Sequence, residues 1–382
     1  MQSVGPEYGF GLYIHWPYCA RVCPYCDFNV YAAKDRDVEP LITAIITDLE
    51  AHRARLPGHP ALDSVFFGGG TPSLLSDAQI ARILDKVNDT FDLAPDAEIT
   101  LEANPNDILR DAPANWAKAG INRLSLGIQS LDDEALAFLG RDHDREAALA
   151  AINAVQAAFD NHSVDLIYAR PDQTLEAWDT ELREVLSLGA PHLSLYELTI
   201  EHRTAFGKRA ARGDLKPMPD DDQADLYDLT QSICEGVGLP AYEVSNHARS
   251  AQYEARHNHI YWASGDWIGL GPGAHGRLTI DGVRVATEAA RRPLEYQTAP
   301  GASETALSRI ETAREFLAMA LRPVNGLDLK RFEDLFGQAP PSSVIADLID
   351  NQLAVLDRHK LKLTSAGRLM ADHIAAQLDP QE

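Results

Sequence analysis

Three of the four cysteines in this 382-residue chain fall within eight residues, and this cluster constrains the fold and chemistry more than any other feature. Cys19, Cys23 and Cys26 are spaced C-x3-C-x2-C on a segment that follows Pro17. Residues 11–16, rich in aromatic and aliphatic side chains, predict a short buried strand that ends at this proline. The sequence therefore predicts a group of thiols just beyond the end of a buried strand.

The chemistry of thiolate ligands leaves three interpretations of this cluster open. Clustered thiolates select zinc, Cu(I) or an iron–sulfur cluster. A structural zinc site needs a fourth protein ligand, which His15 could supply, and Cys23 with Cys26 could instead form a thioredoxin-like redox pair. A four-iron cluster on three thiolates keeps one iron free for a small molecule. We favour the iron–sulfur cluster because neither alternative explains the third thiol together with the flanking aromatics Tyr18, Tyr25 and Phe28. The distant Cys234 is predicted to be a buried free thiol in an amphipathic helix.

The residues around the cysteines carry a resemblance to a known superfamily. The pattern Y-x-H-x-P-x-C-x3-C-x2-C, which begins at Tyr13, resembles the radical S-adenosylmethionine superfamily. More narrowly, the chain is similar to the branch that holds oxygen-independent coproporphyrinogen III dehydrogenase and the HemW-type haem chaperones. The resemblance implies a [4Fe–4S] cluster on the three cysteines, with S-adenosylmethionine (SAM) on the fourth iron. In such proteins an electron from the reduced cluster can cleave the sulfonium to a 5′-deoxyadenosyl radical.

The order of the predicted elements indicates an α/β barrel. Strand-like and helix-like segments alternate in about six βα repeats, which favours parallel strands with helices outside them. A doubly wound open sheet would give the same alternation, but the cysteines and other polar motifs sit at or just beyond strand ends, where barrel active sites are built. The superfamily resemblance implies an open, partial (β/α)6 barrel. The predicted strands are residues 11–16, 63–67, 98–103, 122–129, 163–168 and 192–199, and the predicted helices are 38–54, 76–88, 107–119, 132–139, 145–159 and 175–188.

The sequence after the repeats predicts two further parts. Residues 203–222 are polar and predict a loop, whereas residues 241–280 are dense in His, Trp, Tyr and Gly and are expected to wrap across the barrel mouth. A hairpin with its turn at Asp281-Gly282 is predicted next. Helices, a short strand and a final helix complete the chain and resemble the winged-helix-like C-terminal α+β domain of this branch. The predicted division is 1–205 for the barrel, 206–300 for the connection across its mouth and 301–382 for the C-terminal domain.

The GGGTP segment after the second predicted strand is a candidate SAM site. A tight glycine turn offers backbone N–H groups suited to a carboxylate or an amino-acid headgroup. By resemblance, Gly69, Gly70 and Thr71 contact SAM, and Tyr13 and Tyr25 lie beside the cluster.

Four further polar residues are candidates for lining the same pocket. Glu102 ends a predicted strand, where its carboxylate could accept hydrogen bonds from ribose hydroxyls or an ammonium group, or could instead cap a helix. Gln129, Arg141 and Asp165 match positions that in the dehydrogenase line the cofactor pocket and touch a second SAM. For Arg141 the alternative is a surface ion pair with a neighbouring aspartate. Whether this chain binds a second SAM stays open.

Two departures from the dehydrogenase argue against decarboxylation of coproporphyrinogen III. The dehydrogenase has a further cysteine two residues after the triad, where this chain has Asp27-Phe28. The dehydrogenase also has a longer segment before its Tyr-x-His than the twelve residues that precede Tyr13 here. Whether the chain is an enzyme is therefore left undecided by the sequence.

A second motif points to haem. HNHIYW, residues 257–262, matches the HNxxYW motif of the HemW-type haem chaperones. His257 offers an imidazole nitrogen to haem iron, Asn258 could orient that imidazole or meet a propionate, and Tyr261 and Trp262 offer flat faces to a porphyrin. Alternatively, these residues only seal the barrel mouth. Other candidates for the axial ligand are His247, His259 and His275.

Charge and hydropathy restrict the partners. A net charge of −23 opposes binding to nucleic acid or to an anionic membrane. No run approaches the roughly 18 apolar residues of a membrane span, so stable membrane insertion is not expected. The N-terminal residues lack the features of a signal peptide, and clustered thiols indicate a reducing compartment. We therefore expect a cytoplasmic protein.

The preferred hypothesis is a haem chaperone that carries a [4Fe–4S] cluster and SAM and delivers haem to haem-requiring respiratory proteins. The resemblance implies membrane-associated acceptors and an electron donor for the cluster. The alternative is an oxygen-independent coproporphyrinogen III oxidase (dehydrogenase) of porphyrin biosynthesis, and a weaker third is another radical-mediated modification in a porphyrin-sized pocket.

Overall fold

One open, twisted sheet of eleven strands dominates the structure, a computed structural model that describes residues 4–33, 37–108 and 112–379. Its strand order is β13-β12-β11-β10-β1-β4-β5-β6-β7-β8-β9, and all neighbours from β10 to β8 pair in parallel. The two outer strands, β13 and β9, do not pair with each other within the described residues, so the predicted partial barrel is confirmed as open. The strands are β1 (Phe10–Trp16), β4 (Leu62–Gly69), β5 (Leu93–Ala103), β6 (Arg123–Gln129), β7 (His162–Tyr168), β8 (His192–Glu197), β9 (Asn246–Ala248), β10 (Asp266–Leu270), β11 (His275–Ile280), β12 (Val283–Ala289) and β13 (Ala302–Ala306).

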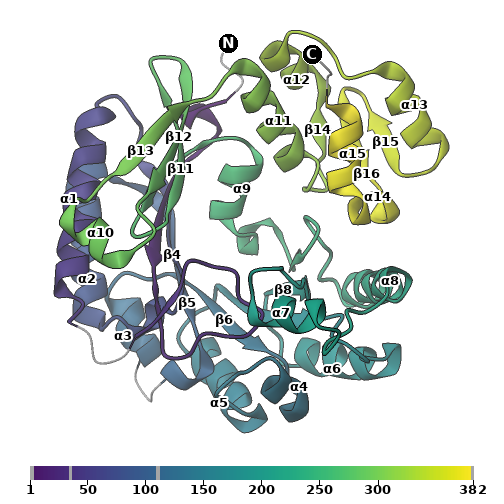
Figure 1. The fold of residues 1–382 in the computed structure, drawn as a ribbon, viewed down its shortest axis with the longest axis horizontal. Helices are drawn as coiled ribbons and strands as arrows, with labels where there is room; N and C mark the ends of the chain where they lie inside the picture. The colour runs from purple at the N-terminus through teal and green to yellow at the C-terminus, as the bar shows by residue number, and fades with distance from the viewer. Residues whose placement is uncertain (1–3, 34–36, 109–111, 380–382) are drawn as a thin grey trace.

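Helices cover the outer face of the sheet (Figure 1). In α2, Ser76 caps the first turn through a capping box with Gln79, and a stripe of aliphatic side chains at helical spacing is buried against the sheet. Most residues of β1 are buried because the strand is covered on both faces, as in other parallel sheets. The covering helices are α1 (Glu39–Arg55), α2 (Asp77–Phe91), α3 (Ala112–Lys118), α4 (Asp133–Phe138), α5 (Arg145–Gln156), α6 (Leu175–Ser187), α8 (Asp220–Gly236) and α10 (Pro293–Thr298).

The predicted strands and most predicted helices are present. The hairpin is confirmed as β11 and β12, and Asp281 (φ +49°) with Gly282 (φ +79°) makes the left-handed turn that such a connection needs. Cys234 is a buried free thiol on α8, as predicted. The helix predicted over 107–119 is shorter, because α3 begins at Ala112; residues 109–111 lie outside the described residues.

Two predictions for the middle of the chain need correction. The loop predicted over 203–222 contains a short helix, α7 (Ala205–Ala211), in which Phe206 is fully buried and Thr204 caps the first turn. The sequence did not predict this helix because Phe206 is its single large apolar residue, and one residue gives no helical periodicity. Residues 241–280 do not only cross the barrel mouth: they provide β10, which pairs with β1 and extends the sheet, and α9 (Arg256–Trp262).

The C-terminal residues form a compact α+β unit with its own core. Buried Phe316, Leu317, Phe332 and Leu361 pack together there. Its sheet has three strands where one was predicted, and the hairpin β15–β16 after the helices gives the winged-helix-like arrangement. The division at residues 205 and 300 stays a prediction. The elements are α11 (Arg309–Ala320), β14 (Leu327–Asp328), α12 (Leu329–Phe336), α13 (Ser342–Asp350), β15 (Ala354–Asp357), β16 (Lys360–Leu363), α14 (Ser365–Leu369) and α15 (Ala371–Leu378).

Membrane crossing can be tested on the helices. Among the described residues, none of the helices combines the length and apolar character that a membrane span requires.

Candidate functional site

The cysteine loop runs between two short paired strands, β2 (Tyr18–Cys19) and β3 (Tyr31–Ala32), and crosses in front of the barrel toward α7 (Figure 1). Its middle is held by Pro24, whose carbonyl accepts a hydrogen bond from the backbone N–H of Phe206 at 2.9 Å. On the other side lies Gly140, where a Cβ would come within 2.6 Å of the proline ring. The loop is therefore clamped between α7 and the turn after α4.

The end of the cysteine loop is anchored by a residue that sequence reasoning missed. The amide of Asn29 donates to the carbonyls of Pro272 and Arg291, both at 2.8 Å. Gly273 lies so close that a Cβ there would sit 2.5 Å from the same amide nitrogen. The half-buried Asn29 and the glycine-rich turn that it contacts lie far apart in the sequence, so no local pattern predicted this contact.

The three thiols line a single cavity of about 630 Å³. Burial raises the pKa of Cys19 and Cys26, the latter to about 11, and the neighbouring thiols raise both further by repulsion between thiolates. Within the described residues no three His, Cys, Asp or Glu side chains are arranged as a metal centre. A cationic cluster would stabilise all three thiolates, so the donor set fits an iron–sulfur cluster.

His15 is not placed as a fourth zinc ligand. Its Nδ1 lies 2.9 Å from the Tyr13 hydroxyl and its Nε2 lies 3.0 Å from the carbonyl oxygen of Asn29. Burial lowers the pKa of His15, which favours the neutral ring. With both nitrogens used, His15 positions the loop end against β1.

The GGGTP turn uses its backbone donors inside the protein, contrary to the prediction that they face a ligand. Gly69 N–H donates to the Glu102 carboxylate at 3.0 Å, and Gly70 N–H donates to the carbonyl of Trp16 at 2.7 Å. Thr71 N–H donates to the carbonyl of Tyr18 at 2.8 Å. The groups of the turn that remain for a ligand are hydrogen-bond acceptors. They suit an ammonium group better than a carboxylate.

Two buried carboxyl groups lie deeper in the cavity. Burial and the nearby Asp165 raise the pKa of Glu102 to about 7, although Gly69 N–H opposes this shift. Burial also raises the pKa of Asp165, which accepts hydrogen bonds from Ser125 at 2.7 Å and Ser163 at 2.8 Å. Asp165 lies in the middle of β7 and not at its end, so its side chain points into the barrel from below the mouth.

Arg141 reaches into the cavity and is not a surface residue. Its guanidinium donates to the Cys23 sulfur at 3.4 Å and to the Gly127 carbonyl at 3.0 Å, and it also bonds the Asn104 side chain. Its Nε is buried and has no hydrogen-bond partner among the residues that the structure describes. The guanidinium also lies beside Tyr25, whose pKa burial raises. The sequence alternative of a surface ion pair is wrong, and Arg141 instead ties the cysteine loop to β6.

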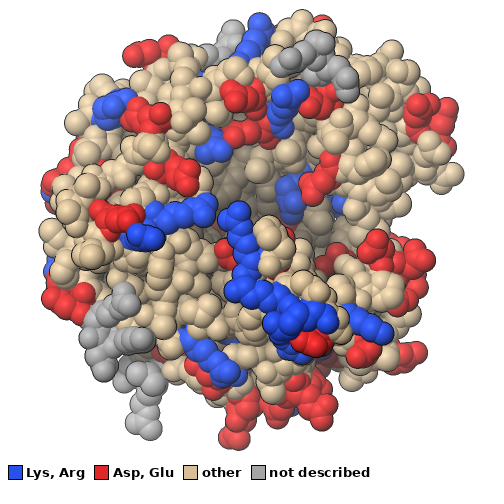
Figure 2. All heavy atoms as spheres, in the orientation of Figure 1, with Lys and Arg blue, Asp and Glu red and all other residues tan. Residues whose placement is uncertain are grey.

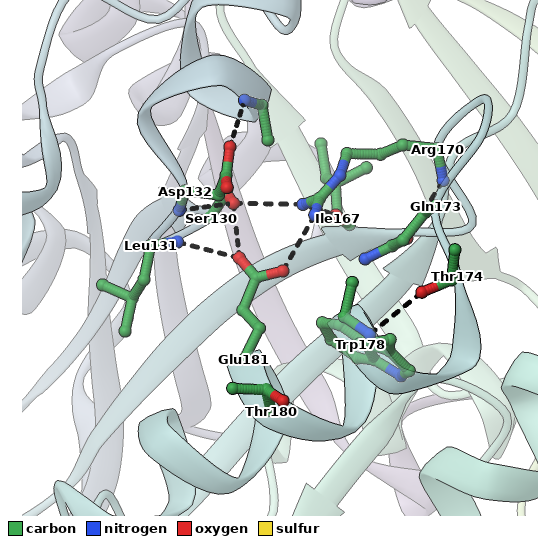
Figure 3. A network of polar contacts seen from close by, with 12 residues as sticks. Ser130, Leu131, Asp132, Ile167, Arg170, Gln173, Thr174, Trp178, Thr180 and Glu181 are labelled. Atoms are coloured by element: carbon green, nitrogen blue, oxygen red, sulfur yellow. Dashed lines mark hydrogen bonds and ion pairs between the residues drawn. The ribbon is translucent and has the colours of Figure 1, made fainter.

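Gln129 lies at the irregular end of β6, next to a turn that the buried ion pair of Arg170 and Glu181 stabilises. It has φ +65°, at the point where the register between β6 and β7 shifts. Directly after it, Ser130 donates to Glu181 on α6, and the Glu181 carboxylate also accepts from Arg170 at 2.8 Å (Figure 3). Arg170 donates in turn to the carbonyl of Ile167 near the end of β7 at 3.0 Å. Sequence reasoning missed this network, whose members come from three separate elements.

The HNHIYW motif forms α9, which fills the side of the barrel next to β1 and β4. Both ring nitrogens of His257 are engaged: Nδ1 lies 2.8 Å from the Ser64 hydroxyl and Nε2 lies 2.5 Å from the Tyr261 hydroxyl. Its ring stacks on Phe66 with centroids 5.1 Å apart, and burial lowers its pKa to about 3. Trp262 points the other way and packs on Tyr242 outside the cavity.

The structure brings most of the predicted site residues to the same cavity. The exceptions are Trp262 and the three alternative axial ligands, His247, His259 and His275, which do not line it. Asn104, two residues after Glu102 in TLEANP, could have been found from its place beyond a strand end. The cavity is lined by Tyr13, Cys19, Cys23, Tyr25, Cys26, Gly69, Gly70, Thr71, Glu102, Gln129, Arg141, Asp165, His257, Asn258 and Tyr261.

Known proteins resemble this chain over nearly its whole length. The radical SAM superfamily matches residues 13–185, and the HemN C-terminal domain matches residues 307–370. The chain is 36% identical over 391 residues to mouse "Radical S-adenosyl methionine domain-containing protein 1, mitochondrial", covering 97% of this chain and 87% of the relative. It is 41% identical over 286 residues to "Heme chaperone HemW" of Escherichia coli K12, covering 74% of each chain.

A solved structure has the same fold. Coproporphyrinogen III oxidase (HemN) from Escherichia coli superposes with a TM-score of 0.79 at 23% identity, covering 97% of this chain and 90% of that chain. This likeness confirms the open barrel with its C-terminal domain. Together with the relatives above, it leads to one conclusion: the chain belongs to the radical SAM superfamily, in the family of the HemW-type proteins.

Proposed function

We propose that this protein binds haem and delivers it to haem-requiring proteins. The observation that carries the proposal is similarity over 74–98% of the chain to relatives named heme chaperone HemW, at 31–41% identity, in a chain that also has the HNHIYW motif. Membrane-associated respiratory proteins are the proposed acceptors, and the proposed compartment is the reducing cytoplasm, because three clustered thiols need to stay reduced.

The proteins of this superfamily use a [4Fe–4S] cluster and SAM, and we assign the cluster ligands to Cys19, Cys23 and Cys26. When bound, this pair supplies one-electron cleavage of a sulfonium. Glu102, ionised above a pH of about 7, accepts from the ammonium group of SAM. Arg141 holds Cys23 and the Gly127 carbonyl in place.

We propose His257 as the axial ligand of haem iron. In the present arrangement Nε2 bonds Tyr261, so iron binding through this nitrogen requires the phenol to turn away. Asn258 also lines the cavity, and we assign it to a haem propionate. Tyr13 and Phe66 line the same wall with flat rings. Trp262, the last residue of α9, faces away from the cavity and packs on Tyr242, so we do not assign it to the porphyrin.

An anaerobic haem titration followed by absorbance tests this assignment. We expect His257→Ala to weaken haem binding at least tenfold, and Tyr261→Phe to tighten it, because the latter variant frees Nε2. His373→Ala, an exposed histidine on α15, is the matched control. Unchanged haem binding in His257→Ala would mean that the axial ligand is His247, His259 or His275. A wild-type protein that binds no haem ends the proposal.

The second candidate function is oxygen-independent oxidation of coproporphyrinogen III, because the fold is that of an oxidase of this substrate. Asp27-Phe28 after the cysteine triad argues against it. The reconstituted protein with SAM, reductant and coproporphyrinogen III is expected to form no protoporphyrinogen. Catalytic product formation would replace the chaperone proposal with the oxidase.

A further inference from the structure

Basic side chains gather on and beside α7, at the mouth of the central cavity. Figure 2 shows lysines and arginines in a band over this helix, next to the hollow in the middle of the molecule. We call this set the basic cluster. Within the described residues only Arg212 of the set forms an ion pair, with Asp214 at 2.9 Å. The basic cluster consists of Arg203, Lys208, Arg209, Arg212 and Lys216, all exposed except the half-buried Arg209.

This concentration of positive charge is unusual for the chain as a whole. The protein has 57 acidic and 34 basic residues, so most of its surface repels anionic partners. Residues 203–216 hold five cations and one carboxylate, Asp214, whereas the next helix, α8, begins with three acidic residues, Asp220–Asp222. The positive field is therefore confined to α7 and the residues beside it. Such a field steers an acidic partner to one place and orients it, because approach elsewhere is repelled.

One layer of side chains separates the basic cluster from the cysteines that we assign to the iron–sulfur cluster. Phe206, on the same helix, donates its backbone N–H to the Pro24 carbonyl, which lies between Cys23 and Tyr25 in the sequence. The ring of Phe206 packs on Tyr25 with centroids 6.4 Å apart. Arg209 covers the outer face of the Phe206 ring at 5.5 Å. A partner seated on α7 is thus separated from Cys23 and Cys26 by these two rings.

We infer that the basic cluster is the docking surface for an acidic one-electron carrier protein that reduces the iron–sulfur cluster. The carrier's flavin or iron–sulfur centre is oxidised by one electron, and the cluster held by the three cysteines is reduced from the 2+ to the 1+ state, with no bond formed or broken. The inference rests on the cluster assignment and not on haem binding. Nucleic acid and anionic membranes share the charge preference, but neither explains why the cations sit directly over the cysteine loop.

The experiment compares two double charge reversals in the cluster-loaded protein. Lys208→Glu/Lys216→Glu alters exposed, unpaired members of the basic cluster. The matched control, Lys330→Glu/Arg358→Glu, changes the net charge equally on exposed residues of the C-terminal unit. The probe is a reduced acidic flavodoxin. Its binding is measured by calorimetry with wild type and both variants, and cluster reduction is followed by stopped-flow absorbance with flavodoxin or with dithionite.

We expect the basic-cluster variant to bind flavodoxin at least tenfold more weakly and to lose most of the salt dependence of its reduction rate. Reduction by dithionite, which needs no docking, should change less than twofold, and the control variant should resemble wild type. The inference is overturned if flavodoxin does not bind wild type, if both variants lose binding equally, or if the basic-cluster variant loses only its binding to phosphatidylglycerol vesicles.

Two further measurements distinguish a failed docking surface from a failed iron–sulfur assignment or a failed haem assignment. Iron and sulfide analysis of each variant reports whether the cluster is present, independently of docking. Lys208→Gln/Lys216→Gln removes the charge without reversing it and should give an intermediate loss of flavodoxin binding. Haem titration of the same variants is expected to be unchanged, so that a failed haem proposal and a failed docking surface give different results.

Discussion

At the residue scale, Glu102 shows how burial turns an ordinary carboxylate into a pH-sensitive group. Its folded pKa of about 7 lies above the usual value of 4.5. Between these two values the unfolded chain has lost the proton that the folded protein keeps. The free energy of unfolding therefore falls as pH rises through this window, and Glu102 costs stability above pH 7. A cationic ligand beside the carboxylate would offset this cost.

Glu102→Gln tests both consequences. We expect the ligand-free variant to be more stable than wild type at pH 8, by about 3 kcal/mol, and to lose the corresponding decline between pH 4.5 and 7. SAM binding to the wild type should tighten roughly eightfold from pH 6 to 7.5, as the ionised fraction of Glu102 rises. Calorimetry on the variant should show weaker binding without this pH dependence. A variant that keeps the wild-type pH profile would remove Glu102 from the SAM site.

At the element scale, the ends of β6 and β7 are joined to α6 by buried charges. Arg170 and Glu181 are each less than a tenth exposed and form an ion pair at 2.8 Å. They fix the turn that begins at Ser130, and this turn holds Gln129 in its left-handed conformation. Removing one charge leaves the other buried and unpaired, which costs more than the pair contributes.

Glu181→Ala is therefore expected to lower the free energy of unfolding by about 3–5 kcal/mol, measured by urea denaturation. Glu184→Ala on the same helix breaks a half-exposed pair with Arg145 and should cost no more than about 1 kcal/mol. The double variant Arg170→Met/Glu181→Leu should recover much of the loss. Equal effects at Glu181 and Glu184 would mean that burial does not set the strength of this pair.

At the scale of the whole molecule, Arg331 is one of the contacts that hold the C-terminal unit against α9 and its neighbours. Arg331 on α12 donates to the carbonyl of Ala263, just after α9, at 2.5 Å. Its guanidinium lies 3.4 Å from the ring centroid of Tyr8 and 4.6 Å from that of Phe316. Burial lowers its pKa to about 10, still far above neutral pH, so the cation is retained. This contact links the C-terminal unit to the HNHIYW helix.

Arg331→Ala should weaken this contact between α12 and the end of α9. We expect faster hydrogen exchange in α9 and α12 by about tenfold or more, corresponding to a loss of roughly 1.5–2 kcal/mol from the cation–π and hydrogen-bonded contacts. The neighbouring Lys330→Ala, an exposed side chain, is the control and should leave exchange unchanged. If α9 exchanges at the wild-type rate in Arg331→Ala, the Arg331 contact does not restrain the motif.

The sequence by itself determined the features that depend on short-range chemistry. The spacing of Cys19, Cys23 and Cys26 predicted an iron–sulfur site, the alternation of apolar segments predicted the parallel barrel, and Asp281-Gly282 predicted the hairpin. Each of these signals lies within a few residues or repeats along the chain, where periodicity and turn preferences act.

Only the tertiary structure decided which groups meet and which are already used. The GGGTP donors bond Glu102 and the carbonyls before the cysteine loop, Trp262 faces away from the cavity, and α7 covers the cysteine loop. Partners in these contacts come from distant parts of the chain, and no local pattern encodes such pairing. Hydrogen-bond satisfaction and burial are properties of the packed molecule, so they could be assigned only once the sheet had brought those segments together.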